Sequence, residues 1–211
     1  MSRYPLSRLA ALALGAAIAF AGGPPLAATD EDDAAAVARV EDYLNAITTL
    51  RANFVQVAAD GSIAEGTLYI ARPGRLRIEY APPAKIKMVS DGEWLTYIDG
   101  EIGQISQMPL SETPAGVLVR EDIRFGDDIV VSRVERDAQI LRVTLTRADS
   151  PDEGSFTLVF SEKPFELRQW VVVDAQGFAT RITLFGTQRG IALDPELFAA
   201  PPPFPTGGEM R

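Results

Sequence analysis

Residues 63–80, which read IAEGTLYIARPGRLRIEY, decide the fold of this chain. In the second half of the stretch apolar residues alternate with charged ones, so Leu76, Ile78 and Tyr80 share one face of an extended chain. Pro73-Gly74 stands between the two halves and favours a tight turn. Because two strands joined by so short a connection must run antiparallel, the stretch predicts a β-hairpin.

The same period of two continues on both sides of this hairpin and is interrupted by turn-forming dipeptides such as Asp-Gly. It predicts about eleven strands, at residues 51–58, 63–72, 75–80, 85–90, 93–98, 102–108, 129–136, 139–147, 155–161, 166–173 and 178–187. The short loops make sequence neighbours antiparallel, in one meander. A sheet of this size twists strongly and curls towards a barrel. Such a barrel either encloses a cavity or has a core filled by side chains, and the pattern leaves both open.

Two helical stretches are expected, one before the sheet and one in its middle. The first covers residues 31–48, where Val40, Leu44 and Ile47 recur at intervals of three and four and form one apolar stripe. Such a stripe could close the mouth of a barrel or simply pack on it. The second is a short helix within residues 109–125, for which we expect Ser111 as the N-terminal cap, with Val117 and Leu118 behind it.

The amino-acid composition excludes several classes of function. The 211 residues include no Cys and no His, which excludes disulfides, Cys nucleophiles, Ser–His–Asp triads and His-ligated zinc. With 20 Lys+Arg against 29 Asp+Glu the net charge is −9, which argues against nucleic-acid binding. A carboxylate hydrolase would need acid pairs that converge in a pocket, whereas the pairs here fall in predicted loops, at Glu121/Asp122, Asp127/Asp128 and Asp152/Glu153. We expect neither an enzyme nor a cofactor.

Residues 1–28 have the features of a secretory signal peptide. Arg3 and Arg8 form a positive start, and residues 9–21 form an uncharged run that is shorter than the roughly 20 residues a spanning helix needs. An uncleaved anchor is the alternative reading of this segment. Because lipid anchoring of a bacterial lipoprotein requires a Cys, we expect an unanchored protein, located in the periplasm of a Gram-negative cell. The mature chain, residues 29–211, is expected to form a single domain with a Pro-rich tail.

The alternation along the hairpin leaves two possibilities for Arg72. It shares strand parity with Leu68 and Ile70, so it points inward if they do. An inward guanidinium keeps its charge and needs acceptors, and the unpaired carbonyls at a helix C-terminus could supply them. Alternatively, Tyr69 belongs to the buried face and Arg72 is solvated at the strand end, as most arginines are.

Five runs of the chain, taken in order and spacing, resemble one known family. They read YLNAITTLRANFVQ at 43–56, EGTLYIARPGRLRIEY at 65–80, MVSDGEWLTYID at 88–99, ETPAGVLV at 112–119 and LDPELFAAPP at 193–202. The most specific pieces are Arg72-Pro73-Gly74 and the VSDG of residues 89–92. Together these runs resemble the periplasmic outer-membrane lipoprotein carrier family, LolA, over about residues 37–202.

This resemblance implies a mainly β fold, an unclosed antiparallel barrel covered by an N-terminal helix and a short central helix, with an apolar cavity. In the family, the cavity receives the acyl chains of lipoproteins from an inner-membrane ABC transporter and passes them to an outer-membrane receptor. The absence of Cys fits a carrier, because the receptor is itself acylated on a Cys. The partners implied are thus lipoproteins, the transporter and the receptor, with no nucleic acid and a monomeric carrier. The alternative is a periplasmic binder or sensor of another hydrophobic ligand, a glycolipid or a free lipid.

The resemblance also assigns roles to individual residues. The family's Arg-Pro motif falls on Arg72, which would hold the lid closed through hydrogen bonds to helix backbone. The residues expected at the lid and the acyl-binding cavity are Val40, Leu44, Ile47, Leu68, Ile70, Leu76, Ile78, Tyr80, Val117 and Leu118. One departure is Ile78, because the best-known relatives carry a bulky aromatic residue at this position.

Overall fold

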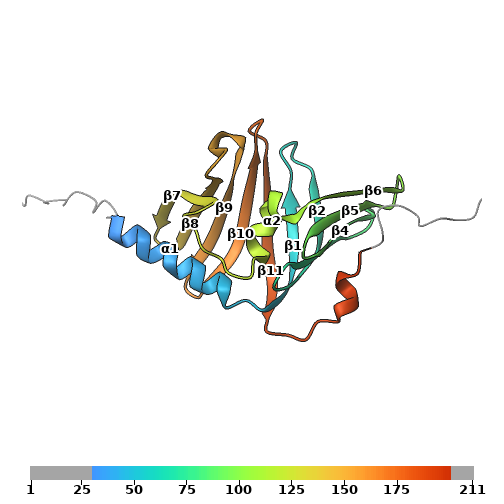
Figure 1. Ribbon diagram of the computed structural model, residues 1–211, viewed down its shortest axis with the longest axis horizontal. Coiled ribbons are helices and arrows are strands. Elements are labelled where there is room, and N and C mark those ends of the chain that lie inside the picture. The colour runs from blue at the N-terminus through green and yellow to red at the C-terminus, as the bar shows by residue number, and fades with distance from the viewer. Residues whose placement is uncertain (1–29, 201–211) are drawn as a thin grey trace, which may run out of the picture.

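A single antiparallel sheet forms the body of the protein in the computed structural model, which describes residues 30–200 (Figure 1). The predicted signal peptide at residues 1–28 and the tail from residue 201 onward lie outside the described residues. Among the described residues, none of the helices combines the length and the apolar character needed to cross a membrane.

Eleven strands make up the sheet in this part of the chain. They are β1 Thr49–Val57, β2 Ile63–Ala71, β3 Arg75–Tyr80, β4 Ile86–Asp91, β5 Trp94–Asp99, β6 Gln104–Pro109, β7 Ile129–Asp137, β8 Ile140–Arg147, β9 Gly154–Glu162, β10 Phe165–Asp174 and β11 Ala179–Arg189. The strands predicted from the sequence are confirmed, with bounds that differ by at most two residues. The helical segments are α1 Asp30–Asn45, η1 Leu110–Glu112, α2 Pro114–Val119, η2 Pro151–Glu153 and η3 Pro195–Phe198.

The strand order is β6-β5-β4-β3-β2-β1-β11-β10-β9-β8-β7, so the sheet consists of two meanders joined where β1 pairs with β11. The sequence predicted a single meander, and this prediction is wrong because β1 pairs with β11. Local turn signals do not indicate a pairing between strands so far apart in the sequence. Strands β6 and β7 are consecutive in the chain but lie at opposite edges of the open sheet. The connection between them therefore has to cross the sheet, and it carries α2 across the middle of the molecule in Figure 1.

The short central helix begins at a different residue from the one expected. Ser111 lies within η1, and Thr113 is the N-cap of α2, where its Oγ1 accepts a hydrogen bond from the Gly116 backbone N at 3.1 Å. The reason is Pro114, which has no N–H and a fixed φ and is therefore well suited to the first helical position. The residue before it then becomes the cap.

Helix α1 packs across the β7–β10 half of the sheet. The ring of Tyr43 meets those of Phe160 and Phe165 edge to face, at centroid distances of 5.2 and 5.6 Å. The Arg39 guanidinium pairs with Glu162 on β9 at 2.6 Å and lies over the Phe165 ring. These contacts position the helix beside the sheet and bury its apolar stripe in the main core.

The two most specific sequence motifs, at residues 72–74 and 89–92, pack against each other. Gly74 has a φ of +74°, and a Cβ placed on it would lie 2.5 Å from the Cα of Gly92. The buried Ser90 hydroxyl donates a hydrogen bond to the Gly74 carbonyl at 2.9 Å. The Gly74 backbone N donates to the carbonyl of Val119 at 2.7 Å, which attaches this turn to the end of α2.

We expect Gly74→Ala to lower the free energy of unfolding by about 3 kcal/mol, because it combines an unfavourable positive φ with a clash against Gly92. Gly61→Ala is the matched control, since Gly61 also has a positive φ, of +83°, but nothing lies within 4 Å of its added Cβ. The control should cost only about 1 kcal/mol. Urea unfolding of both variants measures the difference, and equal losses would contradict the packing argument.

Candidate functional site: an apolar hollow under a hydrogen-bonded segment

A cavity of about 390 Å³, here called the inner hollow, lies between the concave face of the sheet and α2. Its lining is mainly aliphatic, aromatic and methionine side chains from strands of both meanders. Five of the residues expected from the sequence line it: Leu68, Leu76, Ile78, Tyr80 and Leu118. The volume falls within the range of small-molecule sites, about 300–1,000 Å³.

Two polar side chains at the wall of the inner hollow, Tyr80 and Gln56, pair with each other. The Tyr80 hydroxyl donates to Oε1 of Gln56 at 2.7 Å, and its ring meets Phe54 edge to face at 5.3 Å. Burial raises the pKa of Tyr80, which keeps the phenol neutral around pH 7. Met88 and Met108, also in the lining, are flexible side chains that adapt to different apolar shapes. The hollow therefore offers non-directional apolar contacts.

The other expected residues lie elsewhere. Val40, Leu44 and Ile47 are buried in the main core and none of them lines the inner hollow. Ile70 is likewise buried, with 4 % of its surface exposed, and stays outside the lining. Val117 lines a second cavity described below.

Several lining residues were not predicted from the sequence, including Leu95, Phe156, Trp170 and Ile182. Strand parity assigns such residues to a face of the sheet. It does not indicate which part of that face remains uncovered, because this depends on the β1–β11 pairing and on the path of the β6–β7 connection.

The Arg72 side chain bridges two separate segments of backbone. Its Nη1 donates to the carbonyls of Leu44 and Ile47, at the end of α1 and just beyond it, the latter at 3.4 Å. Its Nε donates to Arg120 O at 2.8 Å and its Nη2 to Glu121 O at 3.1 Å, both just after α2. Burial lowers the pKa of Arg72, but a guanidinium keeps its proton at neutral pH.

Asn45, the last residue of α1, completes this network and was not found from the sequence. Its Oδ1 accepts from Arg72 Nη2 at 3.0 Å and from the backbone N of Ile123 at 2.9 Å. Its Nδ2 donates to the Ile123 carbonyl at 3.0 Å. One turn earlier, Glu41 Oε1 accepts from the Phe125 backbone N at 2.6 Å. Residues 120–125, here called the strap, are thus held by α1 at two points.

The spacing of Glu41 and Asn45 is the sequence feature from which their contacts with the strap could have been predicted. The two residues are four apart, and each directly follows a residue of the apolar stripe, Val40 or Leu44. Polar side chains in that position lie at the border of a buried helix face, where they can reach the backbone of a neighbouring segment.

We expect Asn45→Ala to lower the free energy of unfolding by about 1–3 kcal/mol, because it leaves the buried backbone of Ile123 without partners. Amide hydrogen exchange should show faster exchange at Ile123. Asn53→Ala is the control, since the Asn53 side chain accepts one long hydrogen bond, from Thr67 at 3.4 Å. Unchanged exchange at Ile123, with a loss of stability no larger than that of the control, would contradict this role for Asn45.

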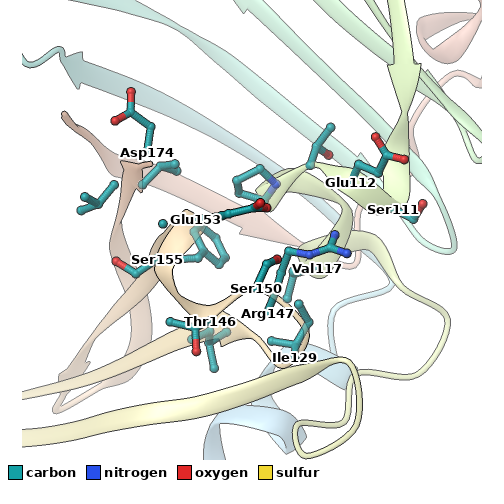
Figure 2. A pocket seen from close by; sticks show the side chains of 17 residues that line it. Ser111, Glu112, Val117, Ile129, Thr146, Arg147, Ser150, Glu153, Ser155 and Asp174 are labelled. Atoms are coloured by element: carbon teal, nitrogen blue, oxygen red, sulfur yellow. The ribbon is translucent and has the colours of Figure 1, made fainter. Parts of the chain in front are cut away.

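A second cavity, here called the rim hollow, has a volume of about 550 Å³ and lies between the start of α2 and the β8–β9 connection. Val117, Ile129 and Leu145 supply apolar lining, and all three are buried. In Figure 2, Val117 and Ile129 lie near Arg147, Ser150 and Thr146, while Glu112 and Asp174 lie on opposite sides of the view.

Four ionisable residues line the rim hollow, namely Glu112, Arg147, Glu153 and Asp174 (Figure 2). Arg147 is ion-paired with Asp149 through two contacts, of 3.1 and 3.0 Å. The hydrogen bonds between them raise the pKa of Arg147 and lower that of Asp149. The other three ionisable groups are acids, so the border of the rim hollow is negative at neutral pH.

The acid pairs considered for hydrolysis are all exposed. Asp128 is ion-paired with Arg120, whose hydrogen bonds hold the pKa of Asp128 below its usual value. Asp122 contacts Arg124 at 3.4 Å. Within residues 30–200 there is no cluster of three or more acidic side chains arranged to hold a metal ion.

An open antiparallel sheet, a hollow apolar interior and a hydrogen-bonded segment across it define a half-barrel with an internal binding cavity. The family model described as "Outer membrane lipoprotein carrier protein LolA" matches residues 45–201, and this chain belongs to that family.

Relatives across much of the chain carry the same description. An outer-membrane lipoprotein carrier protein of Methylococcus capsulatus is 28% identical over 175 residues, which cover 78% of this chain and 83% of the relative. One of Pseudomonas aeruginosa is 28% identical over 199 residues, 90% of each chain. The crystal structure of a LolA superfamily protein from Nitrosomonas europaea overlaps 78% of this chain and 97% of its own, with 11% identity and a TM-score of 0.46.

Proposed function

We propose that this protein is a lipoprotein carrier, which shields the acyl chains of lipoproteins in the inner hollow. The observation that carries the proposal is an apolar hollow of about 390 Å³ in a chain of the LolA family. The proposal extends to the transfer steps: acyl chains are accepted from an inner-membrane ABC transporter and released to an outer-membrane receptor. The mature chain, residues 29–211, would act as a single-domain monomer in the periplasm after removal of residues 1–28.

The energetics suit such a role. Exposing an acyl chain to water costs about 0.8 kcal/mol per methylene, so a 16-carbon chain costs roughly 12 kcal/mol. A hollow that removed this whole cost would bind too tightly for release. Each charged hydrogen bond of Arg72 favours the closed, empty state by about 1.5–3 kcal/mol, and an entering ligand has to break some of these bonds. Competition between closure and ligand lowers the net affinity and favours handover.

A different hydrophobic ligand, such as a glycolipid or a free lipid, remains the alternative, because an apolar wall does not distinguish among alkyl chains. Mass spectrometry of the lipids that co-purify with the protein from periplasm tests this directly. Acylated peptides support the lipoprotein carrier, and free lipids alone contradict it. A hydrolase has less support, since the acid pairs are exposed.

We expect Arg72→Leu to take up a fluorescent lipopeptide normally but to release it about tenfold more slowly, because closure no longer competes with the ligand. Transfer from the loaded variant to the purified receptor measures the release rate. Arg133→Leu is the control, because Arg133 is an exposed arginine on β7, remote from the Arg72 network. Release from Arg72→Leu at the rate of the control would remove Arg72 from this role.

We expect Ile78→Trp to weaken binding of an acyl probe by about tenfold, because the larger side chain takes up part of the inner hollow. Ile63→Trp is the control, since Ile63 lies at the exposed start of β2. Titration with a fluorescent fatty-acyl probe gives both affinities, and near-ultraviolet circular dichroism checks that each variant is folded. Equal affinities would place the ligand outside the inner hollow.

A further inference from the structure

An acyl chain of a lipoprotein is covalently attached to a polar glyceryl group and, through it, to a polypeptide. If the inner hollow holds the alkyl part, as proposed above, the polar part has to leave the protein through an adjoining region. We propose that the rim hollow is this region, and that it binds the glyceryl ester and the first residues of the attached peptide. This inference rests on the proposed function and adds a second binding site to it.

The two cavities adjoin each other, which supports this assignment. The inner hollow and the rim hollow share five lining residues: Glu112, Thr113 and Pro114 at the start of α2, and Phe156 and Val172 on the sheet. The first turn of α2 therefore forms part of the wall of both cavities. A third cavity, of about 580 Å³, is lined by Arg77 and Lys87 and shares only Tyr80 with the inner hollow. It therefore borders the inner hollow at fewer residues than the rim hollow does.

The lining of the rim hollow matches a group that is half apolar and half polar. Its buried apolar residues, Val117, Ile129 and Leu145, suit the first methylenes of an acyl chain. Its partly exposed Ser150 and Ser155, together with the exposed Glu153, suit ester and peptide groups that remain hydrated. The inner hollow, in contrast, offers few polar atoms.

The charges around the rim hollow indicate which peptide sequences would bind there best. Arg147 pairs with Asp149 and also attracts Glu153 and Glu112 electrostatically, but the carboxylates of Glu112 and Glu153 accept no hydrogen bond from the described residues. These carboxylates favour a peptide with basic or neutral residues after the lipidated position over one with acidic residues. Exposed charge pairs are weak and are screened by salt, so two carboxylates should give a preference of roughly threefold at low salt.

Photo-crosslinking tests the location of the polar part. The chain has no Cys, so single substitutions can carry a thiol-linked benzophenone: Ser155→Cys in the rim hollow, Met88→Cys in the inner hollow and Ala84→Cys in the third cavity. The ligand is a synthetic dipalmitoyl-glyceryl-Cys peptide followed by Ser and four Lys. Mass spectrometry of the adducts should find glyceryl or peptide attached at position 155, alkyl chain at 88 and none at 84. Ser150→Cys repeats the first probe if Ser155→Cys does not fold.

Alkyl adducts at position 88, with peptide adducts at 84 and none at 155 or 150, would overturn the inference and leave the carrier function intact. Absence of alkyl adducts at 88 would instead contradict the proposed function itself. As a second measurement, Glu112→Gln/Glu153→Gln should abolish the preference for the lysine peptide over a glutamate peptide of the same length. The control is Glu65→Gln/Glu101→Gln, at exposed positions outside both hollows. If Glu112→Gln/Glu153→Gln keeps the preference for the lysine peptide, the assignment of the polar part to the rim hollow is also overturned.

Discussion

The half-buried guanidinium of Arg72 connects the end of α1 to the segment that follows α2. A charged group partly removed from water needs acceptors, and the final carbonyls of a helix need donors. Arg72 donates hydrogen bonds to Leu44 O at the end of α1 and to Arg120 O after α2, so the guanidinium gains acceptors and these carbonyls gain donors. When these bonds open, water can replace the lost partners, so the cost of opening stays moderate. An interaction of this kind can hold a segment in place without making it immovable.

The topology of the sheet explains why a cover exists. Strands β6 and β7 follow each other in the chain but form the two unpaired edges of the sheet. Their connection must therefore cross the concave face, and it carries only the short helices η1 and α2. So short a segment covers the face without filling the space beneath it, and the inner hollow of about 390 Å³ remains. The hollow thus follows from the strand order as well as from the apolar side chains that line it.

Local sequence patterns were sufficient for much of the fold, since alternation and turn dipeptides located the strands. The β1–β11 pairing could not be predicted in this way, because turn signals specify only neighbours in sequence. For the site, parity located Leu76 and Ile78 on the concave face, but it left the direction of Arg72 open, and only the family resemblance chose between the alternatives. Asn45 was missed because its spacing from Glu41 indicates only a polar side chain at the border of the helix face, whereas its partners, Arg72 and the backbone of Ile123, come from distant parts of the chain.

The two helices over the sheet differ in how firmly they are held, and this difference suits the proposed carrier. Helix α1 is attached to β7 and β9 by ion pairs of Asp33 and Arg39 and to β10 by aromatic packing of Tyr43. Helix α2 has only six residues. Its Val117, Leu118 and Val119 pack in the core, and hydrogen bonds to the Arg72–Gly74 turn and, through the strap, to α1 add to this packing. A short segment held partly by hydrogen bonds of partly exposed groups opens at lower free energy than the centre of the sheet. Opening at α2 would join the two hollows that its first turn separates, while α1 and the sheet stay folded.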